Sequence, residues 1–302
     1  GLEDDTNSEG QIACDLDNVF KVIFPSSWSG HNRNCIRKEN ISDFGDEGFL
    51  LYDVLSTEEN QSIISEGEKI GFEQLKGVKD SYRSAQRITI DSSELANKLF
   101  DRIKNYLNPI VFTEGSDPKS QHIHGIPFVL KGNWKPTGIN QIFRLCRYNP
   151  GGHFAPHYDG FYVKNSIERS MKTFMLYLND DFQDGCTNFV DERQSLYKDE
   201  SGKYCAEEKN ILHRIRPHPG MAILFNHHRL HEGQQVRDGV KYILRSDIMY
   251  TKYDGEALNE DDEKALQLLQ EAERLEALGE CTKASEFYRK AFKLSPSLES
   301  SY

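Results

Sequence analysis

The segment FRLCRYNPGGHFAPHYDG, residues 143–160, combines an apolar run, a glycine pair and a histidine–aspartate motif. Its first part has the pattern of a buried strand, and the glycines and Pro156 precede His157 and Asp159. On an extended backbone, side chains two residues apart point to the same side, so His157 and Asp159 can face one point in space. This motif alone is common in loops, and its meaning depends on what accompanies it.

A second group of histidines follows in HHRLHEG, residues 227–233. Two neutral imidazoles and one carboxylate form the facial triad that holds Fe(II) on one face and leaves other positions open. His157, Asp159 and His231 are the candidate ligands. His227 and His228 are near-duplicates of His231, and we expect them to be exposed to solvent at the end of a strand.

Short apolar or alternating runs, separated by Gly, Pro, Asn or Asp, fill the middle of the chain. Such a succession is typical of a β-sandwich or jelly roll. The expected strands are 141–148, 173–178, 211–216, 221–226 and 241–250. The charged segment 191–210 is expected to be a hairpin or an insertion at the rim.

Two helices are predicted before this β region. One covers 57–70, where Ser56 and Glu59 have the spacing of a capping box. The other covers 93–107, where Asp91 can cap the start and Pro109 ends the helix. Residues 1–45 are polar and weakly periodic, and they predict an irregular arm.

The C-terminal segment 256–302 returns to helical periodicity with many charges, and it predicts two helices joined near Gly279. The offsets of a tetratricopeptide repeat, which this segment resembles, are matched by Gly279, Ala284, Tyr288, Ala291 and Pro296. A single repeat cannot bury its own face, so it would pack on the main domain or on a protein partner. A helical hairpin without a binding role fits the same pattern.

The composition is that of a folded chain with an acidic surface. The 302 residues include 37 Lys and Arg against 48 Asp and Glu, a net charge of −11, and 37% of them are hydrophobic. Nucleic acid is therefore not an expected partner, and no apolar run reaches the ~18 residues of a membrane span. The polar start lacks the features of a signal peptide, and the six cysteines suit a reducing compartment, so we expect a cytoplasmic protein.

Residues 46–252 resemble the prolyl 4-hydroxylase-like branch of the Fe(II)/2-oxoglutarate-dependent dioxygenases. The matching elements, in chain order, are YNPGGHFAPHYD, TFMLYLND, GCTNF, His231 and the segment VRDGVKY that contains Lys241. The resemblance implies a mainly β fold, a double-stranded β-helix (a jelly roll of the cupin type) with helices against one sheet. This agrees with the strand pattern.

The resemblance also implies roles for individual residues. His157, Asp159 and His231 would bind the iron. Lys241, ten residues after His231, would pair with the distal carboxylate of 2-oxoglutarate. Arg245 shares a strand face with Lys241 and is the alternative for this role.

Further residues are expected around the pocket. Tyr148 and Tyr177 match tyrosines that contact the cosubstrate in relatives, and Arg144 shares a strand side with Tyr148. The candidates for substrate binding are Arg83, Arg87, Arg144 and His153. Surface ion pairs for the arginines of the segment 81–91, and a loop position without function for the histidine, are the alternatives.

The implied activity is hydroxylation of an unactivated C–H bond with Fe(II), 2-oxoglutarate and O2, release of succinate and CO2, and ascorbate as a supporting reductant. Asp159 fills the ligand position that a halide would need, which favours hydroxylation over halogenation. The substrate stays open between a prolyl residue of a protein and a free amino acid or other small molecule. A non-catalytic metal-binding module and a scaffold whose C-terminal hairpin docks a partner are the other functions; no membrane partner is expected.

Overall fold

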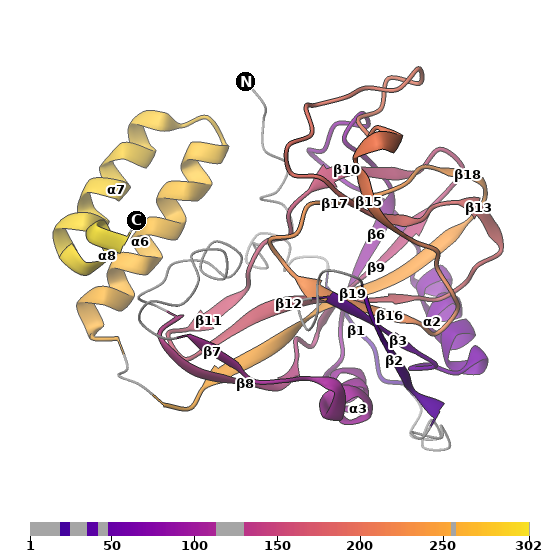
Figure 1. Cartoon of the computed structure of the whole chain (residues 1–302), viewed down its shortest axis with the longest axis horizontal. Helices are drawn as coiled ribbons and strands as arrows, with labels where there is room; N and C mark the ends of the chain where they lie inside the picture. Colours follow the sequence, from indigo (N-terminus) through magenta and orange to yellow (C-terminus); the bar gives the residue numbers. More distant parts are fainter. Residues whose placement is uncertain (1–18, 25–34, 42–47, 113–129, 255–257, 302) are drawn as a thin grey trace.

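The computed structural model describes residues 19–24, 35–41, 48–112, 130–254 and 258–301. Most regular structure in these ranges is strand, gathered into one large and one smaller sheet, with helices beside the large sheet and at the C-terminal end (Figure 1). The predicted fold class, a mainly β jelly-roll core with flanking helices, is confirmed.

The larger sheet has twelve strands. Eight follow one another in the spatial order β1 (Val19–Lys21), β6 (Gln86–Asp91), β9 (Ile142–Tyr148), β19 (Lys241–Lys252), β12 (Glu168–Tyr177), β16 (Ala222–Asn226), β3 (Gly48–Tyr52) and β2 (Arg37–Asn40). The remaining four pair at the margins: β4 (Glu73–Gln74), β7 (Ile110–Phe112), β8 (Gly132–Ile139) and β11 (Val163–Asn165). The five predicted strands all form, with boundaries shifted by a few residues.

The smaller sheet has five strands in the order β15 (Ile211–Ile215), β14 (Thr187–Val190), β17 (His231–Gly233), β10 (His153–His157) and β5 (Arg83–Ser84). A separate antiparallel pair consists of β13 (Phe182–Asp184) and β18 (Val236–Gly239). Between β14 and β15, the charged segment 191–210 contains one antiparallel bridge, Lys198 to Tyr204, and a short 3-10 helix, Glu208–Asn210.

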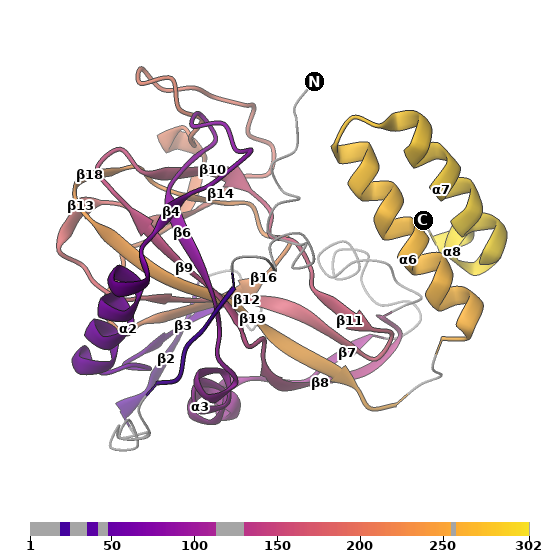
Figure 2. The ribbon, with the colours of Figure 1, turned by 180° about the vertical axis from the view of Figure 1, so that it is seen from behind.

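Two helices cover the outer face of the larger sheet (Figure 2). Helix α2 (Thr57–Ile70) begins with the predicted capping box, in which Ser56 Oγ accepts from the Glu59 N–H and the Glu59 carboxylate accepts from the Ser56 N–H. Helix α3 (Ser93–Ile103) continues as a 3-10 turn, Lys104–Tyr106.

The N-cap of α3 is Ser92, not the predicted Asp91. Ser92 Oγ accepts a hydrogen bond from the Leu95 N–H. Asp91 is the last residue of β6, and its carboxylate accepts from the Gln141 amide instead. The residue next to the helix is the one whose side chain can reach the free N–H groups of its first turn.

The main hydrophobic core lies between these helices and the larger sheet. Ile63, Leu95 and Leu99 belong to the same buried cluster as Leu145 and Phe174 of the sheet. Full burial of each such side chain contributes about 1.5–3 kcal/mol to folding. The opposite face of the sheet is thereby left to line the interior between the two sheets.

Two short strands lie inside the arm that was expected to be irregular. β1 pairs in parallel with β6, and β2 pairs with β3. The sequence of β2 is RKEN, which has no apolar alternation, and β1 is only three residues long. Neither therefore carries a periodic signal. Positions 1–18, 25–34 and 42–45 of the arm lie outside the described residues.

The C-terminal segment forms α6 (Glu260–Ala277), α7 (Cys281–Leu294) and a short third helix, α8 (Pro296–Ser301), which was not predicted. Gly279 connects the first two with φ of 79°. The three helices form a group of their own beside the β core (Figures 1 and 2). They share a small core made by Ala265, Leu269, Ala291 and Leu298. Among the described helices, none has the length and apolar character needed to cross a membrane.

Candidate metal centre

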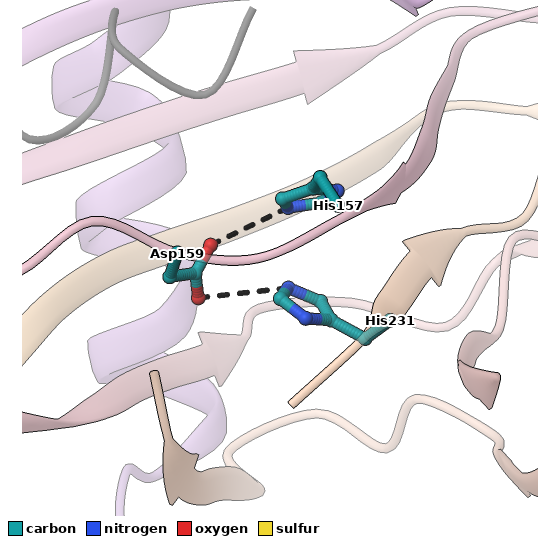
Figure 3. Close-up of side chains that lie close together, drawn as sticks. All are labelled: His157, Asp159 and His231. Carbon is teal, nitrogen blue, oxygen red and sulfur yellow. Dashed lines mark ion pairs between the residues drawn. The ribbon is translucent and has the colours of Figure 1, made fainter. Parts of the chain in front are cut away.

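The three predicted metal ligands converge on one point. His157 Nε2 lies 3.3 Å from Asp159 Oδ1, and His231 Nε2 lies 3.5 Å from Asp159 Oδ2. One ligand atom from each residue lies within 4.8 Å of the other two. Figure 3 shows both imidazoles turned toward the carboxylate. A single cation can therefore be reached by all three side chains.

Pairing of two strands brings the histidines together. His157 ends β10 and His231 begins β17, and the two residues are direct partners across this antiparallel pair. Asp159 lies just beyond β10, where its N–H donates to the carbonyl of His227 over 3.0 Å. The motif and the distant histidine are thus adjacent because of sheet register.

Backbone carbonyls fix the orientation of both imidazoles. His157 Nδ1 lies 2.6 Å from the Ala155 carbonyl, and His231 Nδ1 lies 2.7 Å from the Arg229 carbonyl. A carbonyl oxygen can only accept, so each Nδ1 carries the proton and each Nε2 presents a lone pair. Histidine ligands of metals are commonly held in this way.

The protonation states also suit a cation. Burial alone would raise the pKa of Asp159, but Arg245, His231 and His157 lower it well below its ordinary value of 3.8. Burial lowers the pKa of His231 to about 4. At neutral pH the aspartate is therefore ionised and His231 is neutral, as metal binding requires.

A hydrogen-bonded group supports the carboxylate from behind. Thr173 Oγ1 donates to Asp159 Oδ2 over 2.6 Å and lies 2.8 Å from His227 Nδ1. His227 Nε2 in turn lies 2.8 Å from Ser170 Oγ. The single hydroxyl proton of Thr173 is used by Asp159, so His227 donates to Thr173 and accepts from Ser170.

The expectation that His227 is exposed was wrong: its side chain is fully buried. This burial could not be predicted from the sequence, because the polar partners of His227 come from β12, far away in the chain. His228 stacks on Tyr158, with 4.3 Å between ring centroids. His231 is the histidine of this group that reaches the metal position.

The three ligands lie in the wall of a cavity that is partly open to solvent. Of the residues predicted around the site, Arg83, Arg144, Tyr148, Lys241 and Arg245 line it. Tyr177, Arg87 and His153 are not among the described lining residues. Tyr177 lies behind the wall, where its hydroxyl bonds to Thr187 Oγ1 over 2.5 Å.

His153 connects two strands rather than facing the cavity. Its Nδ1 lies 2.6 Å from Ser84 Oγ, and its Nε2 lies 3.0 Å from the Ser81 carbonyl. Its side chain is buried, and this burial is the main reason that its pKa is lowered. The imidazole therefore fastens β10 to the segment that carries Arg83.

Lys241 places a buried cation in the cavity. It is 3% exposed, and its Nζ lies 5.3 Å and 5.9 Å from the ring centroids of Tyr148 and Tyr177. Burial lowers its pKa to about 8. In the part of the chain that the structure describes, no carboxylate lies within ion-pair distance of Nζ.

Arg245 differs from Lys241 in this respect. Its guanidinium lies 3.6 Å from Asp159 Oδ2 and 3.5 Å from Asp247 Oδ1. Of the two candidate anchors for an organic acid, Lys241 is therefore the one whose charge is not already matched by carboxylates of the described chain.

Phe154 is a residue of the site that sequence reasoning missed. Its ring is stacked on His157 at 3.5 Å between centroids, with an interplanar angle of 8°. The signal was present, since Phe154 lies inside the quoted motif, three residues before His157. The sequence alone does not show that an aromatic ring at this position packs against the imidazole of a ligand.

Comparison with known families decides the identity of this region. Residues 143–246 match the model of the 2OG-Fe(II) oxygenase superfamily, and this range contains all three converging ligands and Lys241. This segment is a 2OG-Fe(II) oxygenase domain. The family uses Fe(II), 2-oxoglutarate and O2, and the chain is accordingly an oxidoreductase. The resemblance seen in the sequence is confirmed at this level.

The residues of the oxygenase domain fit these groups. Two imidazole nitrogens and one carboxylate suit Fe(II) and leave positions open for other ligands. The buried Lys241 ammonium suits a carboxylate of 2-oxoglutarate. No curated protein matches the chain.

Solved structures similar to this chain include several prolyl hydroxylases. A viral collagen prolyl hydroxylase from Paramecium Bursaria Chlorella virus-1, in complex with 2-oxoglutarate, has 20% identity and a TM-score of 0.39, covering 70% of this chain and 99% of its own. A Pseudomonas putida prolyl-4-hydroxylase has 14% identity and a TM-score of 0.41, with coverages of 67% and 92%. A Trichoplax adhaerens prolyl hydroxylase, in complex with a peptide fragment of the hypoxia inducible factor oxygen degradation domain, has 15% identity and a TM-score of 0.39, with coverages of 68% and 84%. Similarities this low transfer no residue's role to this chain.

Proposed function

We propose that the chain hydroxylates an unactivated C–H bond and converts 2-oxoglutarate and O2 into succinate and CO2. The observation that carries this proposal is the convergence of His157, Asp159 and His231 at a cavity that also contains the Lys241 ammonium. The family match over the same residues supports it.

His157 and His231 would hold the metal through Nε2, and Asp159 through a carboxylate oxygen. When bound, Fe(II) with 2-oxoglutarate supplies the oxidising chemistry that activates O2. The two backbone carbonyls keep the imidazole lone pairs turned toward the metal position, and Thr173 restrains the carboxylate. Burial of these groups excludes bulk water from the reaction.

Lys241 would bind the distal carboxylate of the cosubstrate. An ammonium in a site of low dielectric constant attracts a carboxylate strongly, which fixes its orientation and selects for a dicarboxylic acid. The ring of Tyr148 lines the cavity beside Nζ and limits where that carboxylate can lie. Tyr177 lies behind the wall and supports the position of the Lys241 side chain from there.

We propose a prolyl residue of a protein or peptide as the substrate to try first, with a free amino acid as the alternative. A protein partner suits the acidic chain, whose net charge is −11. The repeat-like sequence pattern of α6 and α7 predicts that these helices bind a protein partner, and this stays a prediction.

The test is succinate release from the full chain supplied with Fe(II), 2-oxoglutarate, O2 and ascorbate, with and without candidate peptides. Slow release without substrate is expected, and His157→Ala should abolish it. A chain that binds the metal but forms no succinate under any condition would be a non-catalytic metal-binding module. That result would contradict the proposed function.

The cosubstrate anchor is tested separately. Lys241→Ala should raise the KM for 2-oxoglutarate much more than Arg245→Ala does. Arg245→Ala should instead change the affinity for the metal, because the Arg245 guanidinium lies beside Asp159. Metal affinity is therefore measured for this variant as well. The opposite order of the two KM values would transfer the anchor to Arg245.

A further inference from the structure

One nucleophilic side chain in the cavity wall, Cys146 of β9, has no part in the proposed hydroxylation. Among the cysteines that the structure describes, it is the one that lines the cavity. Cys186 is also buried, Cys205 is half-buried, and Cys35 and Cys281 are exposed. The Cys146 thiol is therefore shielded from bulk solvent but lies beside any molecule bound in the cavity.

Cys146 lies between the cosubstrate anchor and the metal position. The successive pairs of β9 and β19 here are Tyr148 with Lys241, Cys146 with Ile243, and Arg144 with Arg245. The Arg245 guanidinium in turn lies 3.6 Å from the ligand Asp159. Cys146 and Lys241 are diagonal neighbours across the two strands, roughly 7–8 Å apart between Cα atoms. A molecule that extends from Lys241 toward the metal position therefore passes Cys146.

The Lys241 ammonium is the group that would hold such a molecule. It is 3% exposed, and in the described part of the chain its Nζ contacts the rings of Tyr148 and Tyr177 but has no hydrogen bond or ion pair. Burial lowers its pKa to about 8, and the nearby sulfurs of Cys186 and Cys146 act in the opposite direction. A carboxylate is the ligand that satisfies a buried ammonium.

Arg83 acts on the sulfur from the smaller sheet. Its Nη2 donates to Cys146 Sγ over 3.9 Å, and its guanidinium is held over the ring of Phe154, 4.1 Å from the centroid. A thiol in wholly apolar surroundings is unreactive, and the thiolate is the nucleophilic form. A guanidinium at this position stabilises the negative charge that the sulfur carries as it reacts.

We propose that Cys146 is a site of covalent modification by α,β-unsaturated dicarboxylic acids that bind in place of 2-oxoglutarate. One carboxylate pairs with Lys241, and the adjacent double bond lies against Cys146 Sγ. The sulfur bonds to one carbon of the double bond, the π bond breaks, and the thiol proton ends on the other carbon. No oxidant or reductant takes part. The resulting thioether keeps both carboxylates in the cosubstrate position and blocks it. This inference rests on the dicarboxylate anchor of the proposed function.

The test compares probes that differ in charge or in the double bond. Fumarate has both features, dimethyl fumarate has the double bond without the charges, and succinate has the charges without the double bond. The full chain with Fe(II) is treated under anaerobic conditions, so that 2-oxoglutarate can bind without being consumed. Peptide mass spectrometry locates the adducts. Labelling of Cys146 is expressed relative to the exposed Cys281 of the same sample.

Fumarate should favour Cys146 over Cys281, whereas dimethyl fumarate should favour Cys281. Excess 2-oxoglutarate or succinate should suppress the Cys146 adduct alone. Lys241→Met should lower the ratio for fumarate by about tenfold or more, the value of one charge-assisted hydrogen bond. Dimethyl fumarate detects unfolding of this variant, because an unfolded chain exposes Cys146 to the neutral probe as well.

Matched variants control for charge and for the neighbouring thiol. Lys104→Met removes a lysine that is 48% exposed and pairs with Asp101, and it should leave the ratio for fumarate unchanged. Cys186→Ala should keep the adduct at Cys146. In the activity assay, fumarate should inactivate the unmodified protein progressively, while Cys146→Ala should keep its own starting rate.

Three results would overturn the modification site: fumarate adducts at Cys35 and Cys281 without one at Cys146, an unchanged ratio in Lys241→Met, or no protection by 2-oxoglutarate. Succinate release by untreated protein is measured in parallel. A protein that releases succinate but gains no adduct at Cys146 contradicts this inference and leaves the proposed function intact. A protein that gains the adduct but releases no succinate contradicts the proposed function and supports the site.

Discussion

At the scale of single residues, the site depends on side chains that do not touch the metal. Thr173 and His227 hold Asp159 in place, and two backbone carbonyls hold the imidazoles. The three ligands could be predicted because their types and spacing have a known chemistry. Thr173 and His227 could not be assigned this role, because their contact arises only when β12 and β16 pair.

Replacing the support should weaken the metal site without removing it. Loss of a hydrogen-bonding residue behind a metal ligand typically lowers metal affinity by about 10–100-fold. His227→Ala should therefore bind Fe(II) more weakly in an anaerobic titration, yet turn over at saturating iron. His157→Ala should show no specific binding. Equal loss in both variants would mean that the wrong histidine has been chosen as ligand.

The charge of Lys241 should make cosubstrate binding sensitive to pH. Burial lowers its pKa to about 8, so the ammonium present below this pH becomes a neutral amine above it. A neutral amine cannot pair with a carboxylate. The KM for 2-oxoglutarate should therefore rise between pH 7 and pH 9, by up to about tenfold per pH unit above the pKa.

Lys241→Arg provides the control for this prediction. The guanidinium stays protonated over the whole range, so its KM should be nearly independent of pH even if its absolute value is higher. A flat KM between pH 7 and pH 9 for the unmodified protein would show that Lys241 does not titrate there.

At the scale of elements, the sequence predicted well where a local signal exists. The capping box of α2 and the apolar runs of β9, β12, β16 and β19 all lie in the residues that form the element. β1, β2 and α8 were missed, because they are short and are defined by neighbours rather than by their own periodicity. The predicted N-cap of α3, Asp91, was one residue too early. Asp91 and Ser92 are both residues that can cap a helix, and the sequence does not show which of them lies next to its first turn.

A buried ion pair connects the two helices behind the larger sheet. Arg102 Nη2 lies 2.7 Å from Glu59 Oε2, both side chains are 5% exposed, and Arg102 Nη1 also donates to the Val54 carbonyl. Arg102→Met leaves an uncompensated carboxylate and should lower the free energy of unfolding by about 3–5 kcal/mol. Urea unfolding would measure this loss.

A double variant separates the effect of the unpaired Glu59 charge from the loss of the Arg102 side chain. Arg102→Met combined with Glu59→Gln removes the unpaired carboxylate while the glutamine can still accept from the Ser56 N–H. The double variant should therefore be more stable than Arg102→Met alone. If the single variant loses less than about 1 kcal/mol, the pair contributes no more than a surface ion pair.

At the scale of the whole molecule, the residues of the proposed chemistry lie between Arg83 and Asp247, and α6, α7 and α8 contribute none of them. Within the helical group, Ser295 Oγ donates to Asp262 Oδ1 and the Tyr288 hydroxyl donates to Glu276 Oε2. We therefore predict that a chain ending at residue 257 binds Fe(II) and releases succinate at about the rate of the full chain. A loss of more than about tenfold would make the helices part of the catalytic unit.

The metal position and the cosubstrate anchor belong to different layers of the core. His157 and His231 lie on the smaller sheet, while Lys241 lies on the larger one. A keto acid bound to both the metal and Lys241 would connect the smaller sheet to the larger one. Its binding would therefore oppose separation of the two sheets during unfolding. Heat or denaturant should consequently separate the two sheets less readily when iron and keto acid are present together than when either is present alone.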